Sequence, residues 1–454
     1  MAADAQPRPA GPGPRAVPRA TPGAGAAVPG PPRIAPLPGA RHALVLSGGG
    51  ALGAYEVGVM KALTSGDSPV SGFRPLEFGA FSGTSVGAYN ATFMASRRAL
   101  GGRRAIAELE GVWLERIANT PLSCGNGVYR IRGAPFQFLD PSCLLHPLQN
   151  AVALARDAVP LTETFLAQTA RFAKSDQSIP VRVLESIDIA AFVSVSPLDS
   201  LVADTIDVAA LGAAAGRVAV VASDWQTGNA AVFVNEDLAR RFGRLPILAS
   251  MALPGLFPPV VIEGVPYVDG AVTMNTPLKP AIKEGAEVLH VVYVDPLVED
   301  LPFPEVPATV DSVYRLYLIL VADKVTTDLG TAATINALIL GGDVVDLWEA
   351  IAQILNQLDE IPPHFRAIQR LARGVDYRPL EIHKYRPRGV GGNAIGLLDF
   401  QIEAVDRNIA RGFDDAVRHD CVTEGCLLIE PRQWNPAVHR PTVSRTGDDV
   451  WPTV

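Results

Sequence analysis

Short apolar runs, each followed by a glycine-rich or serine-rich turn and then by a helical pattern, recur early in the chain. The run 42–46 is β-rich and predicts a buried strand, which leads through a glycine loop into residues 54–63. Four residues of that segment fall on one helical face: Tyr55, Val59, Ala62 and Leu63. Residues 76–81 and 88–95 repeat the order of strand, turn and helix. Two such units in succession predict a parallel sheet with helices on its faces.

Further along the chain, strand and helix patterns alternate less regularly. Two strands flanking the turn 224–228 predict a hairpin, and other short apolar runs predict further strands. The expected strands are residues 181–184, 191–195, 217–222, 230–234, 265–269 and 288–294. Helical spacing covers residues 106–117 and 148–173, and a short helix is expected at 248–252.

The pattern after about residue 304 is mainly helical. Apolar clusters at helical spacing run through residues 312–358, and another helix is expected at 400–417. We therefore predict an α/β fold, with a central, mostly parallel sheet flanked by helices and a C-terminal helical extension. The expected regions are a leader (1–41), a main α/β domain (42–300) and a C-terminal helical region packed on it (301–454).

Composition narrows the class of protein. The chain has 454 residues, 48% of them hydrophobic, so it can bury a sizeable core, and its net charge of −8 argues against nucleic acid as a partner. Residues 1–41 are nearly all Ala, Pro, Gly and Arg, which predicts disorder and no signal peptide. There is no run of about 18 uncharged apolar residues, so we predict no transmembrane helix. We expect a cytoplasmic protein, with transient contact at a membrane surface compatible with the scattered arginines of the leader.

The cysteines form no pattern of their own. They contain no Cys-x-x-Cys pair and no histidine at zinc-finger spacing, and they are Cys124, Cys143, Cys421 and Cys426. We expect thiols in a reducing compartment and no metal site.

A serine between two glycines is the first candidate for chemistry. Gly83-Thr84-Ser85-Val86-Gly87 reads Gly-x-Ser-x-Gly and lies between a predicted strand and a predicted helix. A strand that turns sharply into a helix exposes the serine hydroxyl at the helix N-terminus, where the dipole favours developing negative charge. The alternative is an ordinary Gly/Ser turn.

The glycine loop from Gly48 to Gly53 has two functional interpretations. Its spacing fits the dinucleotide-binding fingerprint, but the acidic residue about 20 positions on is Asp67, which lies in a loop rather than at a strand end. Consecutive glycines also let backbone N–H groups converge as an oxyanion hole. The Gly-x-Ser-x-Gly turn on a neighbouring parallel strand favours the oxyanion hole, because both loops would open at the same edge of the sheet.

A nucleophilic serine needs a base, and the histidines offer no motif that indicates catalysis. They are His42, His146, His290, His364, His383, His419 and His439. Asp269 follows an apolar strand and precedes Gly270, so a desolvated Asp269 carboxylate with a raised pKa can accept the serine proton directly. The alternative is a simple Asp-Gly turn.

Four ordered blocks resemble the patatin-like phospholipase family and cover about residues 43–284. They are the glycine loop 48–53 with Ala54-Tyr55, the turn 83–87, the Ala-Ser-x-Ala-x-Pro-x-x-Phe-Pro-Pro block at 249–259, and Asp269-Gly270-Ala271 followed by Asn275-x-Pro277. Two departures affect the expected substrate preference. Ala51-Leu52 stands where many members carry a basic residue, and Ala271 stands where many carry glycine.

The resemblance implies a lipid acyl hydrolase of the phospholipase A or lysophospholipase type, acting on lipid esters without metal or cofactor. It makes residues 42–300 a catalytic domain with a Ser-Asp dyad, in which Ser85 is the nucleophile and Asp269 is the base. The implied oxyanion donors are the N–H groups of Gly48, Gly49 and Gly50. The remaining motif positions are Gly53, Gly83, Gly87, Gly270 and Ala271.

Three alternatives stay open at this stage. One is a dinucleotide-binding oxidoreductase built on Gly48–Gly53, and another is a non-catalytic lipid-binding protein that keeps the fold. The third is a hydrolase with a Ser-His-Asp triad, which predicts that one histidine is essential.

Overall fold

The computed structural model describes residues 42–120, 125–132, 147–185, 189–213, 216–294, 380–387 and 394–428, with scattered positions between 312 and 336. The predicted leader 1–41, most of the predicted helical segment 312–358, Cys124 and Cys143 lie outside the described residues.

A mostly parallel sheet forms the centre of the molecule. In the described part of the chain, eight strands build it: β1 (His42–Leu46), β2 (Ala80–Thr84), β5 (Arg217–Asp224), β6 (Ala230–Val234), β7 (Val260–Ile262), β8 (Val265–Asp269), β9 (Val288–Val292) and β10 (Glu381–Tyr385). The strand order is β10-β9-β1-β2-β5-β8-β7, and β6 also pairs with β5. The first five strands in this order are parallel, whereas β6 and β8 pair antiparallel with β5, and β7 with β8. A separate two-stranded sheet joins β3 (Arg130–Ile131) to β4 (Val193–Ser194).

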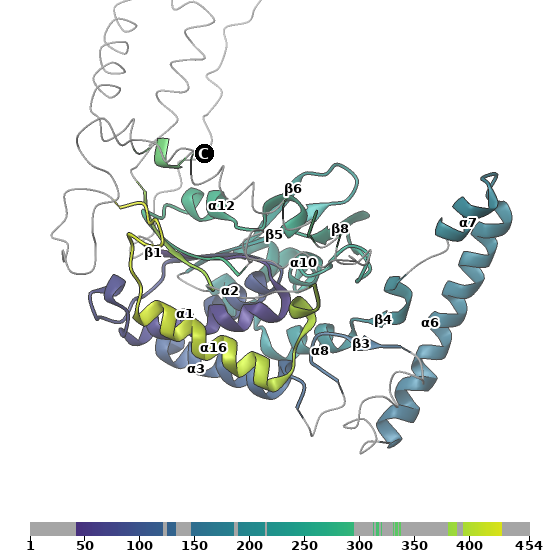
Figure 1. The fold of residues 1–454 in the computed structure, drawn as a ribbon, viewed down its shortest axis with the longest axis horizontal. Helices are drawn as coiled ribbons and strands as arrows, with labels where there is room; N and C mark the ends of the chain where they lie inside the picture. Colours follow the sequence, from purple (N-terminus) through teal and green to yellow (C-terminus); the bar gives the residue numbers. More distant parts are fainter. Residues whose placement is uncertain are drawn as a thin grey trace, which may run out of the picture.

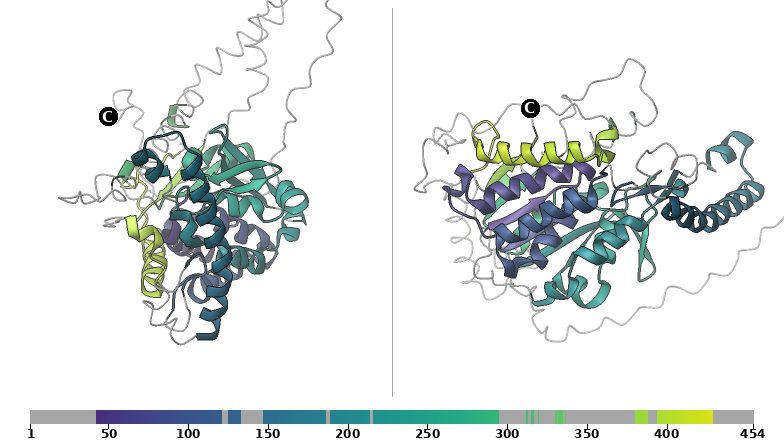
Figure 2. Two further views of the ribbon diagram at one scale, coloured as in Figure 1. Left: turned by 90° about the vertical axis from the view of Figure 1, so that its right-hand side faces the viewer. Right: turned by 90° about the horizontal axis from the view of Figure 1, so that it is seen from below.

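Helices cover both faces of the sheet. One face is covered by α1 (Gly53–Ser65), α2 (Val86–Ser96), α3 (Gly102–Val112) and α16 (Ile402–Val417), and the other by α12 (Leu278–Lys283) (Figure 1). Seen from below, α16, α1 and α3 run side by side across the first face (Figure 2). The predicted α/β fold with a C-terminal helical extension is thus confirmed.

Alternation along the central strands explains why this sheet is buried on both sides. Leu44 and Leu46 belong to the hydrophobic cluster under α1 and α2, whereas Ala43 and Val45 belong to the cluster that includes Leu278 of α12. Each fully buried leucine stabilises the fold by about 1.5–3 kcal/mol relative to an exposed one. A strand that is apolar on both faces therefore specifies a three-layer arrangement.

The helix α16 packs closely on α1, although about 350 residues separate them in the chain. A Cβ added at Gly58 would meet the carbonyl oxygen of Ile409, and one added at Gly412 would meet that of Tyr55. The Tyr55 hydroxyl also donates a hydrogen bond to Asp415 Oδ2 at 3.0 Å. Absence of side chains at both glycines lets the two backbones touch, so α16 belongs to the main helical layer.

Further α-helices among the described residues are α6 (Pro147–Lys174), α7 (Ile179–Glu185), α8 (Ser196–Thr205), α9 (Val208–Ala213), α10 (Leu245–Ser250) and α11 (Ala271–Met274). Both α6 and α7 project from one side of the sheet (Figure 1). Arg130 of β3 makes two hydrogen bonds of 2.6 Å to the buried Asp157 carboxylate, which fixes the near half of α6. No described helix is both long and apolar enough to span a bilayer.

The structure differs from the sequence prediction at several places. Residues 181–184, expected as a strand, lie in α7, because a short apolar run does not by itself distinguish strand from helix. Of the strand expected at 191–195, residues 191–192 lie in the 3-10 helix η5 (Ile189–Phe192) and only Val193–Ser194 form β4. Residues 381–385, within the region expected to be helical, form β10 and extend the sheet beyond β9. The boundary near residue 300 stays a proposal.

Candidate active site

Ser85 lies at the sharp turn between β2 and α2. Its backbone has φ 54° and ψ −126°, a conformation that a non-glycine residue adopts only when the surroundings impose it. A Cβ at Gly83 would meet the Gly87 carbonyl oxygen, and a Cβ at Gly87 would lie 2.5 Å from the carbonyl oxygen of Leu46. Both glycines of the motif are therefore required by close backbone packing. The turn holds the Ser85 side chain at the N-terminus of α2.

Strand register brings Asp269 to this serine. Thr84 pairs with Val221 of β5, so the next residue, Ser85, follows opposite Ala222, which pairs on its other side with Asp269 at the end of β8. The Ser85 Oγ donates a hydrogen bond of 2.6 Å to Asp269 Oδ2. The structure thus joins two residues that are 184 positions apart in the sequence.

The Asp269 carboxylate is buried, and its surroundings favour a base that titrates near neutrality. Burial raises the pKa of Asp269 from 3.8 to about 7, and the hydrogen bonds from Ser85 and from the Ala271 N–H only partly offset this. The Ala271 N–H bonds to the second carboxylate oxygen, Oδ1, at 2.9 Å. Gly270 lies against the backbone of β5, because its Cβ would meet the Val221 carbonyl oxygen. Gly270 and Ala271 thus fix the orientation of the carboxylate.

The glycine loop lies beside Ser85, as expected for neighbouring parallel strands. A Cβ at Gly48 would be 3.0 Å from the Ser85 Cβ. The Gly48 N–H, however, donates a hydrogen bond of 3.0 Å to Asn275 Oδ1. It is therefore not available as an oxyanion donor, contrary to the role that the family resemblance implied for it. Among the described residues, the N–H groups of Gly49 and Gly50 donate no hydrogen bond, and they remain the candidate donors.

Two further features of this loop bear on its role. Gly50 has φ 55° and its Cβ would meet the carbonyl oxygen of Leu397, which lies in the 3-10 helix η8 (Ala394–Leu398). Gly53 begins α1 directly behind Val86 of the serine turn. The acidic residue that a dinucleotide site would place at the end of β2 is absent, because Ser85 follows β2 and Asp67 follows α1.

Ser250 is a functional candidate that the sequence analysis did not identify. Its Oγ accepts the Ser85 N–H at 2.8 Å and donates to the Val221 carbonyl oxygen at 2.6 Å. It therefore satisfies the backbone N–H of the strained residue and ties the serine turn to β5. The Ala-Ser-x-Ala block contains this serine, but its sequence gives no sign that the side chain faces Ser85.

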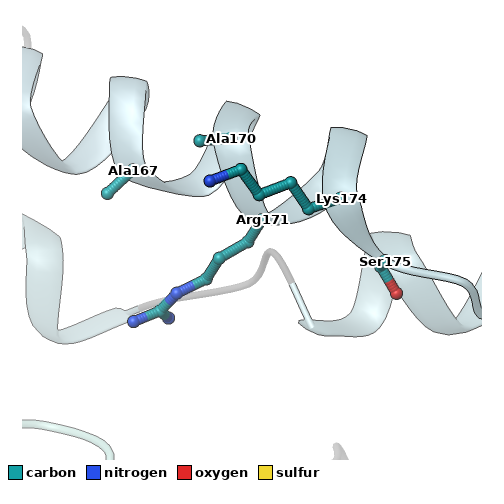
Figure 3. Close-up of a pocket in the computed structure, with 5 residues that line it drawn as sticks. All are labelled: Ala167, Ala170, Arg171, Lys174 and Ser175. Carbon is teal, nitrogen blue, oxygen red and sulfur yellow. The ribbon is translucent and has the colours of Figure 1, made fainter.

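The described histidines lie away from this pair. His42, His290, His383 and His419 gather around β9 and β10, and no described histidine makes a hydrogen bond to Ser85 or Asp269. His146, His364 and His439 lie outside the described residues. A hollow on α6, lined by Ala167, Ala170, Arg171, Lys174 and Ser175, contains no carboxylate (Figure 3). It is not a second candidate for this chemistry.

Comparisons with known proteins show which family this chain belongs to. No curated protein matches the chain. Among solved structures, the chain is similar to VipD from Legionella pneumophila, at 14% identity and a TM-score of 0.32, covering 84% of this chain and 67% of that one. This likeness is too weak to support an argument. A family model described as Patatin-like phospholipase matches residues 44–282, and this range holds the β2–α2 turn, the glycine loop and Asp269. Since the match spans more than half of the 454 residues, the chain belongs to the patatin-like phospholipase family, which implies lipid acyl hydrolase activity.

Proposed function

We propose that this protein hydrolyses carboxylic esters of phospholipids or lysophospholipids with a dyad of Ser85 and Asp269. The observation that carries the proposal is the 2.6 Å hydrogen bond from Ser85 Oγ to a buried carboxylate. Burial raises the pKa of this carboxyl group to about 7, where a general base is effective at neutral pH. Membership of the family supplies the class of substrate.

In the first half of the reaction, Ser85 Oγ attacks the ester carbonyl carbon while its proton passes to Asp269 Oδ2. Negative charge develops on the carbonyl oxygen, where the N–H groups of Gly49 and Gly50 are candidate donors. One such donor contributes on the order of 3 kcal/mol to transition-state stabilisation. The tetrahedral intermediate then expels the alcohol, which takes the proton from Asp269, and the acyl group stays on Ser85.

In the second half, Asp269 takes a proton from water, and the resulting hydroxide attacks the acyl carbon. Collapse of the second intermediate releases the fatty acid, and the proton on Asp269 returns to Ser85 Oγ. Each turnover consumes one water and restores both side chains. Besides the substrate and this water, the steps use only side chains and main-chain groups of the protein.

A fluorophosphonate probe and product analysis test the proposal together. We expect the probe to label wild-type protein at Ser85, and mass spectrometry of a mixed phospholipid extract to show free fatty acid with the matching lysophospholipid. Ser85→Ala should lose both signals, with turnover falling by about 10⁴-fold or more.

The matched control is Ser96→Ala, which removes a hydroxyl from the last residue of the same helix. It should label and turn over as wild type does. Turnover that survives Ser85→Ala would refute the dyad, and loss of activity in a histidine variant of normal stability would favour a triad instead.

We also propose that α6 and α7 contact the lipid surface from which the substrate is taken. Large apolar side chains are exposed along this arm, among them Phe165 (68% exposed), Leu166 (62%) and Ile179 (69%). Val152, Val159 and Leu166 are seven residues apart, which places them along one side of α6. Exposed apolar patches of this kind mark interaction sites, and the family acts on lipids. Cytoplasmic location stays a prediction.

Flotation with phosphatidylcholine vesicles tests this contact. The double variant Phe165→Asp/Leu166→Asp should lose most of the vesicle-bound fraction while hydrolysis of a soluble short-chain ester is unchanged. The control is Ala167→Asp/Ser175→Asp, which adds equal charge at two residues that line the hollow beside Arg171 (Figure 3). Equal binding by both variants would contradict the proposal.

A further inference from the structure

Four buried side chains with metal-binding atoms meet beside β10, outside the part of the chain that the family model matches. They are His383, His419, Cys421 and Cys426, and one donor atom from each lies within 4.8 Å of all the others. Their exposed fractions are 1%, 6%, 0% and 2%. Both cysteines are thiols rather than partners in a disulfide. None of the four takes part in the chemistry proposed for Ser85 and Asp269.

The C-terminal segment brings these residues together through pairing at the sheet edge. After α16 ends at Val417, the chain returns to the sheet, where Leu427 and Ile382 exchange backbone hydrogen bonds of 2.7 and 2.9 Å (Figure 1). Between the end of α16 and Leu427, the Cys426 N–H donates a hydrogen bond of 2.9 Å to the Cys421 carbonyl oxygen and closes a tight turn. The turn therefore presents both sulfur atoms, with His419, to the side chain of His383.

The separations between the donor atoms fit tetrahedral coordination of a single ion. Cys426 Sγ lies 3.3 Å from His419 Nε2, and Cys421 Sγ lies 3.5 Å from His383 Nδ1. Zinc bonds of about 2.3 Å to sulfur and 2.0–2.1 Å to nitrogen place neighbouring tetrahedral ligands about 3.5 Å apart. The cluster thus has nearly the size of a Cys2His2 zinc site before any ion is considered.

Groups around the four side chains also suit metal ligation. His383 Nε2 lies 2.8 Å from Glu381 Oε1, so the ring can donate its proton there and turn the lone pair of Nδ1 toward Cys421. This carboxylate–histidine arrangement is the usual support of a histidine that binds zinc. The Lys384 N–H points at Cys426 Sγ over 3.4 Å, as a donor to a thiolate would. Supporting interactions are therefore present at one nitrogen and one sulfur ligand.

We propose that His383, His419, Cys421 and Cys426 bind one structural Zn²⁺ ion. Two thiolates and two neutral imidazoles would neutralise the ion, and their complete burial leaves no open position for a substrate, as in structural rather than catalytic zinc sites. Binding releases the two thiol protons. The ion would fasten the segment after α16 to β10 and so hold α16 on α1. The sequence predicts no metal site because its cysteines form no Cys-x-x-Cys pair and have no histidine at zinc-finger spacing; His383 lies 38 residues before Cys421.

Metal analysis of protein expressed without a polyhistidine tag tests the site. Inductively coupled plasma mass spectrometry should find about one zinc per chain, and X-ray absorption should find two sulfur and two nitrogen neighbours at the distances above. Replacing the ion with Co²⁺ should give the visible bands of tetrahedral cobalt with a thiolate charge-transfer band. These three measurements use the unsubstituted protein, so misfolding of a variant cannot affect them.

A pair of double variants separates these cysteines from the other two. Cys421→Ser/Cys426→Ser should lower the zinc content at least tenfold, whereas Cys124→Ser/Cys143→Ser should leave it unchanged. A strong chelator should lower the Tm of the wild type by about 5 °C or more, and added zinc should restore it.

Three results would overturn the proposal. One is wild-type protein, prepared with zinc and without chelator, that carries less than a tenth of an equivalent. Another is full zinc retention in Cys421→Ser/Cys426→Ser, and the third is stoichiometric iron or copper in place of zinc. None of these results would affect the proposed ester hydrolysis, because the two proposals share no residue.

Discussion

Two buried polar clusters in this molecule meet the cost of burial in different ways. At the serine turn, Asp269 is kept in an apolar environment that raises its pKa to about 7, and few groups stabilise its charge. Beside β10, four donor atoms converge so closely that one cation would satisfy them all. Burial of polar groups therefore does not by itself indicate whether they serve catalysis or structure. An incompletely compensated carboxylate suits proton transfer, whereas a closed set of ligands suits a structural ion.

The two clusters also differ in backbone. Ser85 is held at φ 54° by tight packing of two glycines, so the serine turn contains conformational strain. The cysteine turn is closed by an ordinary backbone hydrogen bond, and Leu427 continues the pairing of the sheet. Five predictions sharpen or break this comparison.

Removing the base should have the largest effect. Asp269→Asn keeps the size of the side chain but cannot accept the serine proton, so we expect kcat to fall by about 10⁴-fold. Hydrolysis of a soluble ester at pH 8 measures this. Asp406→Asn, an exposed change on α16, is the control and should be unaffected. A loss below tenfold would mean that another group acts as the base.

Disturbing the glycine loop should come next. Gly50→Ala places a Cβ against the Leu397 carbonyl oxygen and shifts the candidate oxyanion donors, so kcat should fall by about 10²–10³-fold. Gly72→Ala is matched to it, because Gly72 has φ 62° but open space around its Cβ position. If both variants lose activity equally, backbone strain rather than the donors explains the result.

The Asp269 carboxyl should also govern how stability depends on pH. Its folded-state pKa, about 7, lies above the ordinary value of 3.8, so this group contributes stability below pH 4 that is lost as the pH rises to 7. Asp269→Asn removes this term. Relative to wild type, the variant should gain about 3 kcal/mol in its free energy of unfolding between pH 5 and pH 8. Urea denaturation at both pH values measures the gain, and a constant difference would contradict the raised pKa.

A smaller effect is expected at Ser250, which we regard as a positioning residue. Ser250→Ala leaves the Ser85 N–H without its acceptor, so unfolding should cost about 1–3 kcal/mol less and kcat should fall about tenfold. KM should hold, because no contact to the substrate is removed. Ser250→Thr, which keeps the hydroxyl, should restore part of kcat, and failure to do so would point to a purely structural role.

The smallest expected effect is at the second cluster. Cys421→Ser/Cys426→Ser should leave the rate of fluorophosphonate labelling at Ser85 within about twofold of wild type, when measured well below its Tm. A loss of labelling in a variant that keeps its near-ultraviolet circular dichroism would show that the clusters are coupled, and would remove the distinction between them.

How far the sequence predicts each cluster follows from how local its determinants are. The serine turn is specified by five consecutive residues between a strand and a helix, and both flanking elements are read from apolar patterns. Predicting that Asp269 lies beside Ser85 from the sequence alone would require the register of β2, β5 and β8. The family resemblance supplied this pairing instead. The role of Ser250 and the engagement of Gly48 by Asn275 depend on side-chain directions that no pattern along the chain records.

The sheet edge shows the opposite case. The sequence Glu381–Tyr385 is short and partly polar, and it becomes a strand because β9 offers it a partner. His383 lies 38 residues before Cys421, and the other three side chains lie in a turn without a recognised spacing, so only tertiary pairing reveals the cluster. The contiguous serine turn could be predicted from the sequence, whereas the cluster beside β10 could not, because segments that are distant in the sequence assemble it.

The glycine contact between α1 and α16 has a consequence for dividing this protein into modules. The family match ends at residue 282, before β9, and even a fragment of residues 42–294 that keeps β9 would lose β10 and α16, leaving β9 as an unprotected edge and an apolar face of α1 in water. Such a fragment should aggregate on expression, and adding residues 380–428 as a separate peptide should rescue it only if the two backbones can still interlock.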